Sequence, residues 1–189
     1  MAGAVRQAVA DIDKLTSGPI VLVAHSIGGA VSPGIAAQLS DRVVHLVHIA
    51  AVAATDGELP LATASQEFAD RLLADADALR RTLNGATFTD GEIAAPAEWR
   101  STNDRAALAR IDSLNFGCVP TSWAGVDPTM GRTFIQPLRD RLYPADAQAR
   151  LAAAMCANEV ITVDAGHNVA RSWPAPLAGL LGEITARYE

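Results

Sequence analysis

The sequence lacks the features that several large classes of function require. It contains a single lysine, Lys14, and neither a G-x-x-x-x-G-K-[ST] nor a G-x-G-x-x-G motif, which argues against nucleotide phosphate binding. Only 19% of the residues are charged and the net charge is −6, so neither nucleic acid nor an anionic membrane surface is an expected partner. No apolar run approaches the length of a membrane span, and the first residues lack the apolar segment of a signal peptide.

Cysteine is scarce as well. Cys118 and Cys156 are the only two, and their separation fits no spacing of metal ligands. We interpret both as reduced thiols of a cytoplasmic protein, with one disulfide as the alternative. The sequence therefore predicts neither a metal nor another cofactor.

Apolar residues are abundant, since half of the 189 residues are hydrophobic, enough for the core of one domain spanning 1–189. The hydrophobic pattern predicts strands at 20–23, 42–52, 132–138 and 159–163, and helices at 3–15, 27–39, 65–83, 96–111, 145–156 and from 174 onward. Strands that alternate with helices predict an α/β fold with a mostly parallel sheet. Pro33 is expected to kink the second helix or rearrange its first turn.

The long connection 56–131 differs in character from the rest of the chain. It contains two predicted helices and several aromatic side chains in turn-rich sequence. We expect it to be a helical cap insertion over a pocket, with a surface excursion as the alternative.

The segment Gly18–Gly29, GPIVLVAHSIGG, is the most informative part of the sequence. A short apolar strand ends in small-x-Ser-x-Gly, close to the G-x-S-x-G motif that places a serine on a strained strand-to-helix turn. Ala24 and Gly28 supply small residues two positions before and after Ser26, where we expect close packing. Ser26 is therefore a predicted nucleophile, the alternative being a serine that only caps the next helix.

A serine nucleophile needs a base and a third group that orients the base. Ser26, Asp140 and His167 each follow a predicted strand, and the carboxyl ends of parallel strands meet at one edge of a sheet. Asp56, after the second strand, is the alternative acid. His45 and His48 lie within a predicted strand, where we expect them to be structural, with local hydrogen-bond partners.

These motifs resemble those of the α/β-hydrolase superfamily, and within it the small esterases of the methylesterase and hydroxynitrile lyase group. The segments that carry the resemblance are Val21–Gly29, Asp41–Val47 with Ala50-Ala51, Phe134-Ile135 with Asp140, and Gly166-His167 followed by Pro174. The resemblance implies Ser26 as nucleophile, His167 as base and Asp140 as acid, with the main-chain N–H of Ile27 as an oxyanion donor. It further implies a carboxylesterase that cleaves a small-molecule ester through an acyl-enzyme.

One departure from the family pattern is pronounced. Such esterases have several strands before the strand that leads to the serine, here called the elbow strand, and a His-Gly loop that supplies a second oxyanion donor. This chain has one predicted helix there and no His-Gly pair, so we expect an N-terminally truncated fold of low activity. The elbow strand should then lie at a sheet edge, which makes a homo-oligomer plausible.

Two other functions follow from the same features. The alternative from another class is a non-catalytic binding or oligomerising module with this fold, suggested by the missing strands. A hydroxynitrile lyase is less favoured, because the sequence does not identify the extra polar pocket residues that such lyases need.

Overall fold

The structure is a computed structural model and describes residues 1–65, 117 and 119–189. The predicted helices 65–83 and 96–111 and Cys118 lie outside the described residues, Ser65 excepted. The same holds for most of the expected cap insertion 56–131.

A sheet of four parallel strands forms the centre of the described chain, and its order is β1 (Ile20–His25), β2 (Val43–Ile49), β3 (Gly131–Pro137) and β4 (Glu159–Val163). In the register, Val23 lies opposite Val47, and Ile135 lies opposite both Ile49 and Ile161. The two central strands, β2 and β3, are mostly buried along their length, as their continuous apolar sequences predict. The predicted α/β fold with a parallel sheet is therefore confirmed.

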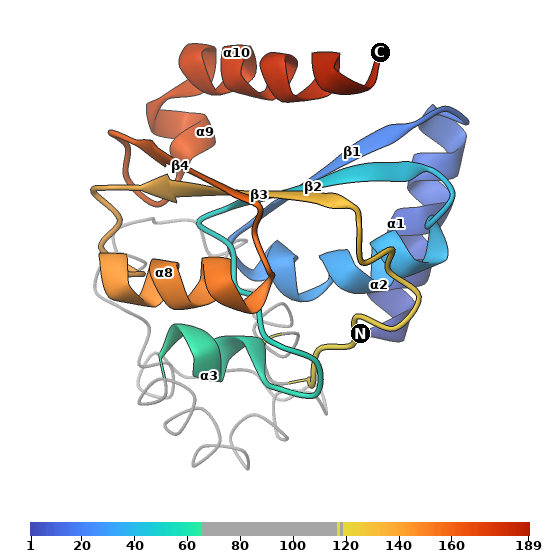
Figure 1. The fold of residues 1–189 in the computed structure, drawn as a ribbon, viewed down its shortest axis with the longest axis horizontal. Helices are drawn as coiled ribbons and strands as arrows, with labels where there is room; N and C mark the ends of the chain where they lie inside the picture. Colours follow the sequence, from blue (N-terminus) through green and yellow to red (C-terminus); the bar gives the residue numbers. More distant parts are fainter. Residues whose placement is uncertain (66–116, 118) are drawn as a thin grey trace, which may run out of the picture.

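Helices cover both faces of this sheet (Figure 1), and the described helices are α1 (Ala2–Leu15), η1 (Ser26–Ala30), α2 (Ser32–Gln38), α3 (Pro60–Ala64), α8 (Ala145–Ala154), α9 (Val169–Ser172), α10 (Pro174–Thr185) and η3 (Ala186–Tyr188). Helices α9 and α10 lie on one face, and α2 and α8 lie on the other. Helix α1 packs against α2, and α3 packs against α8.

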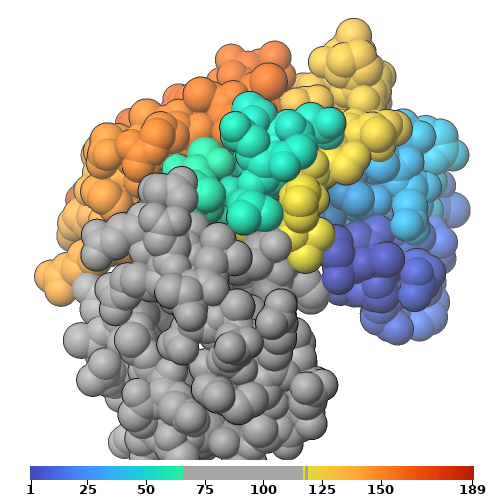
Figure 2. Space-filling model, turned by 90° about the horizontal axis from the view of Figure 1, so that it is seen from below, coloured from blue at the N-terminus to red at the C-terminus, as the bar shows by residue number. Residues whose placement is uncertain are grey.

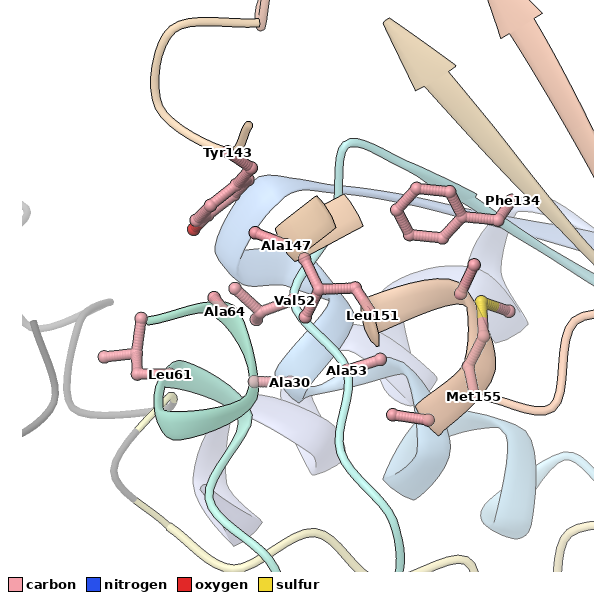
Figure 3. Close-up of a cluster of buried hydrophobic side chains, with 12 residues drawn as sticks. Ala30, Val52, Ala53, Leu61, Ala64, Phe134, Tyr143, Ala147, Leu151 and Met155 are labelled. Atoms are coloured by element: carbon pink, nitrogen blue, oxygen red, sulfur yellow. The ribbon is translucent and has the colours of Figure 1, made fainter. Parts of the chain in front are cut away.

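Alternating side chains of the central strands point into hydrophobic clusters on opposite faces. Val47 packs in one cluster with Ile184 of α10. Leu46, on the other face, packs with residues of α1 and α2, while Phe134 packs with Leu151 of α8 (Figure 3). The sheet is thus the middle layer of a three-layer sandwich, the arrangement that buries both faces of parallel strands.

The segments on either side of residues 66–116 lie next to each other. Gly57 and Thr121 are joined by a 2.8 Å hydrogen bond from the N–H of Gly57 to the oxygen of Thr121, and the N–H of Thr121 donates to Glu58 at 2.8 Å. Figure 2 shows α3 in green between α8 in orange and residues 119–130 in yellow. Both ends of the connection between β2 and β3 are therefore anchored on the α8 side of the sheet.

Strand β1 lies at an edge of the described sheet, as predicted, because it pairs only with β2 there. The side chain of Val23 is 42% exposed, although its sequence is that of a buried strand. An edge strand of this kind leaves main-chain hydrogen-bonding groups and apolar surface unpaired.

Several predicted boundaries are wrong. The predicted helix 27–39 is two elements, η1 and α2, because Pro33 is accommodated only in the first turn of an α-helix. The predicted strand 42–52 ends at Ile49, because Ala50 has a positive φ of 44° that breaks the extended backbone. The short helix α3, which begins at Pro60, was not predicted.

Candidate active site

Ser26 stands at the turn between β1 and η1 with a φ of 54°. A non-glycine residue in this left-handed region is strained, and such strain is typical of functional turns. The main-chain oxygen of Ser26 accepts a 3.0 Å hydrogen bond from the N–H of Val52, which follows β2. The turn is thereby fixed to the neighbouring strand's end, with the serine side chain at the carboxyl edge of the sheet.

The close packing expected at Gly28 occurs one residue later. A Cβ at Gly28 would meet no described atom within 4 Å, whereas a Cβ at Gly29 would collide with the oxygen of Val52. The expectation about Gly28 was therefore wrong, since η1 turns that position outward. Ala24, on the strand side of the serine, is buried as expected.

The structure brings Ser26, His167 and Asp140 into one chain of hydrogen bonds. Nε2 of His167 lies 2.9 Å from Oγ of Ser26, and Nδ1 lies 2.9 Å from Oδ2 of Asp140. Since a carboxylate can only accept, the proton between Asp140 and His167 belongs on Nδ1. Nε2 then presents its lone pair to the serine hydroxyl, the arrangement that a general base requires.

Asp140 is held in place by its own turn. Its side chain is fully buried, and Oδ1 accepts hydrogen bonds from the N–H groups of Leu142 at 2.7 Å and Tyr143 at 3.0 Å. The buried amide of Gln148 donates to the oxygens of Pro137 and Tyr143, which flank this turn. Asp140 therefore cannot rotate without breaking its hydrogen bonds to Leu142, Tyr143 and His167.

His25 fixes the loop that carries His167. Its Nε2 lies 2.9 Å from the main-chain oxygen of His167, and the two rings have centroids 5.0 Å apart. Loss of solvation lowers the pKa of His25, and the hydrogen bond to the oxygen of His167 opposes this shift. A neutral ring with its proton on Nε2 satisfies that carbonyl.

The alternative acid, Asp56, lies elsewhere. Its Oδ1 accepts a 2.7 Å hydrogen bond from the N–H of Trp123, so it anchors residues 119–130, whereas the carboxylate next to His167 is that of Asp140. Asp56 and Trp123 thus join the two ends of the connection between β2 and β3.

The two strand histidines have local partners, as predicted. His48 is fully buried, and its Nε2 lies 2.7 Å from Oγ of Ser32, which itself donates to the oxygen of Gly29. His45 is bonded through Nε2 to Thr133 at 2.8 Å and through Nδ1 to the Tyr188 hydroxyl at 2.6 Å. Neither ring forms a described hydrogen bond with Ser26.

Ile27, the expected oxyanion donor, directly follows the serine as the second residue of η1. The first N–H groups of a helix have no partner within the helix, so its main-chain N–H is available beside Oγ of Ser26. Ile27 itself packs against the cluster that contains Leu61 and Tyr143.

Three further residues at the site were not identified from the sequence: His25, Tyr143 and Gln148. Tyr143 and Gln148 come within eight residues after Asp140, yet nothing in their spacing distinguishes them from ordinary loop and helix residues. His25 adjoins the serine, but the direction of its side chain depends on where the chain brings His167.

Other classes of site are not found within the described ranges. Residues 1–65, 117 and 119–189 contain no group of three or more His, Cys, Asp or Glu side chains that could hold a metal ion. None of the helices in these ranges is long and apolar enough to cross a membrane. Cys156 is a free, exposed thiol.

Comparisons with known proteins agree with the fold. A search of curated protein sequences finds no match, whereas 240 solved chains match in structure. An extracellular α/β-hydrolase from a Paenibacillus species, described as homologous in structure and function to tobacco salicylic acid-binding protein 2, matches with 18% identity and a TM-score of 0.65 over 95% of this chain and 77% of its own. A pyrethroid hydrolase from Sphingobium faniae JZ-2 matches with 17% identity and a TM-score of 0.59 over 94% and 74%.

Polyneuridine aldehyde esterase is a further match, with 15% identity and a TM-score of 0.60 over 89% of this chain and 72% of its own. The chain thus spans about three quarters of these structures, whose low identities show the shared fold alone. The sequence model of the alpha/beta hydrolase family matches residues 2–180, nearly the whole chain. The chain therefore belongs to the alpha/beta hydrolase family.

Proposed function

We propose that this hydrolase is a serine carboxylesterase that cleaves small esters through an acyl-enzyme. The observation that carries the proposal is the hydrogen-bonded chain Ser26–His167–Asp140, with both distances at 2.9 Å. The strained backbone of Ser26 supports it, because the fold maintains that conformation at a cost in stability.

In the proposed reaction, Ser26 Oγ attacks the ester carbonyl carbon while its proton passes to Nε2 of His167. Asp140 stabilises the imidazolium through Nδ1, and the N–H of Ile27 donates to the oxyanion. The tetrahedral adduct collapses as His167 protonates the leaving alcohol. A water molecule, deprotonated by His167, then attacks the acyl-enzyme and releases the acid.

Apolar side chains beside the nucleophile support an ester with a small apolar acyl group. Ile27, Leu61 and Tyr143 belong to the same hydrophobic cluster. Gly117 lies against it, since a Cβ there would collide with Leu61 and lie 3.1 Å from Ile27. The described surroundings of Ser26 thus include little that would bind a charged acyl chain.

The proposal is tested by labelling the chain with a fluorophosphonate probe and measuring hydrolysis of p-nitrophenyl acetate. Labelling and turnover should both vanish in Ser26→Ala. Asp140→Asn should lower kcat by about 10³- to 10⁴-fold because it removes the acceptor that sets the His167 tautomer. Asp56→Asn, the matched control, should leave kcat within two-fold of wild type.

A non-catalytic binding or oligomerising module is the second proposal. The position of β1 at the sheet edge, with Val23 exposed, favours it. Equal fluorophosphonate labelling of wild type and Ser26→Ala, with no esterase turnover, would support this module and exclude the esterase.

A further inference from the structure

Tyr143 lies in the turn that holds the proposed acid. Its N–H donates to Oδ1 of Asp140 at 3.0 Å, and its main-chain oxygen accepts a 2.8 Å hydrogen bond from the buried amide of Gln148. The main chain of Tyr143 is therefore fixed by the same contacts that orient Asp140.

The side chain of Tyr143 reaches the other two residues of the proposed triad. Its ring stands edge-on to the His167 imidazole, with centroids 5.4 Å apart and an interplanar angle of 70°. The Ser26 side chain is one of the groups that influence the pKa of its phenol, so the hydroxyl lies near Ser26. The residue is only 7% exposed, and Figure 3 shows its hydroxyl pointing away from Phe134.

The phenol remains a donor at any working pH. Burial is the main cause that raises the pKa of Tyr143, and the negative charge of Asp140 raises it further, whereas the interaction with Ser26 opposes the shift. When the Ser26 hydroxyl donates to Nε2 of His167, it cannot also donate to the phenol, so the Tyr143 O–H can turn toward another acceptor.

We propose that Tyr143 is a catalytic residue that donates its O–H to the oxyanion of the tetrahedral adduct. In the free enzyme the phenol lies near Ser26. In the adduct the oxyanion is attached to the same carbon as Oγ, which brings it within reach of a phenol beside that atom. Tyr143 keeps its proton throughout, and the proton that moves is the one exchanged between Ser26 and His167.

This inference rests on the proposed esterase function and deepens it. In the proposed reaction Ile27 supplies one main-chain donor to the oxyanion. Losing a single oxyanion donor typically costs about 10²- to 10³-fold in rate. A phenol beside the nucleophile would add a further donor of this kind.

The test is Tyr143→Phe, which keeps the ring against His167 and removes only the hydroxyl. The turnover number for p-nitrophenyl acetate should fall about 100-fold while KM changes less than three-fold, because the hydrogen bond to the oxyanion exists only in the transition state. The Ki of a trifluoromethyl ketone, which forms a tetrahedral adduct with serine, should rise by a similar factor.

Tyr188→Phe is the matched control, since it removes the only other tyrosine hydroxyl in the sequence. That hydroxyl is bonded to His45 near the start of β2, whereas Ser26 follows the end of β1. It should leave kcat and Ki unchanged. A Tyr143→Phe enzyme with kcat within two-fold of wild type, or with an unchanged Ki, would overturn the inference while leaving the esterase proposal intact. A wild-type chain without Ser26-dependent turnover would overturn both.

Folding of Tyr143→Phe is checked by its thermal midpoint. Should this variant unfold, fluorotyrosine can be incorporated at position 143 in the Tyr188→Phe background. Fluorotyrosine retains the ring and the hydroxyl but changes the strength of the hydroxyl as a hydrogen-bond donor. The inference predicts a changed kcat, and an unaltered kcat contradicts it.

Discussion

Nε2 of His25 donates a hydrogen bond to the main-chain oxygen of His167 at a distance of 2.9 Å. The residue before the proposed nucleophile thus anchors the loop that carries the proposed base. This contact joins positions 142 residues apart in the sequence. It fixes the distance between the turn after β1 and the loop after β4, on which any reaction between Ser26 and His167 depends.

The first prediction concerns this anchor. His25→Leu removes the donor and should lower kcat for p-nitrophenyl acetate by about three- to ten-fold, the equivalent of one hydrogen bond. His25→Gln retains an amide donor and should keep most of the activity. Equal losses in the two variants would show that the hydrogen bond is unimportant.

The second prediction concerns acid stability. Burial, helped by the positive charge of Arg132, lowers the pKa of His48 from 6.5 to about 4 in the folded chain. The unfolded chain binds more protons between these values, so the free energy of unfolding should fall as the pH drops from about 6.5 to 4 and level off below. The full contribution of His48 is about 3 kcal/mol.

Urea unfolding midpoints measured between pH 4 and 8 test this dependence. His48→Gln should flatten the curve relative to wild type. His25 and His45 also have lowered pKa values, both mainly through loss of solvation, and they contribute in the same direction. A variant curve parallel to that of wild type would exclude His48 as a source of the pH dependence.

The third prediction concerns the glycine pair after the serine. Gly29→Ala places a Cβ against the oxygen of Val52 and should lower the free energy of unfolding by about 1–3 kcal/mol through overpacking. Gly28→Ala meets open space and serves as the control, with a change below about 0.5 kcal/mol. Urea midpoints decide between them, and a greater loss in Gly28→Ala would contradict the structure.

The fourth prediction concerns the edge strand β1. Val23→Lys places a charge on its exposed apolar surface and should reduce self-association measured by light scattering. Leu15→Lys alters a residue that is 84% exposed at the end of α1 and belongs to no strand, and it should have a smaller effect. Equal effects would mean that association does not depend on this edge.

The sequence predicted the sheet and the candidate triad because both depend on local patterns. Apolar runs bounded by turn residues identify strands, and the polar residues that follow parallel strands must gather at one edge. Ser26, Asp140 and His167 all follow that rule. Contacts that depend on how distant segments meet, such as His25 with His167, carry no comparable signal.

The errors in the prediction have identifiable physical causes. Gly29, not Gly28, is the tight position because the 3-10 geometry of η1 directs it toward Val52. The second strand was predicted too long because residues after Ile49 are as apolar as those before it, although Ala50 leaves the extended conformation. A hydrophobic run in the sequence indicates that a segment is buried, not that it is extended. A buried segment with irregular backbone therefore has the same sequence pattern as a strand.

The most direct test of the proposed acyl-enzyme mechanism is to mix the purified chain with p-nitrophenyl acetate, quench it in acid within a turnover, and locate the acetyl group by peptide mass spectrometry. We expect one acetyl group on the Ser26-containing peptide of the wild-type chain. His167→Ala should accumulate this acetyl group only to a small extent, and Ser26→Ala should lack it. Hydrolysis without acetylation of Ser26, or equal acetylation of the Ser26→Ala chain, would contradict this mechanism.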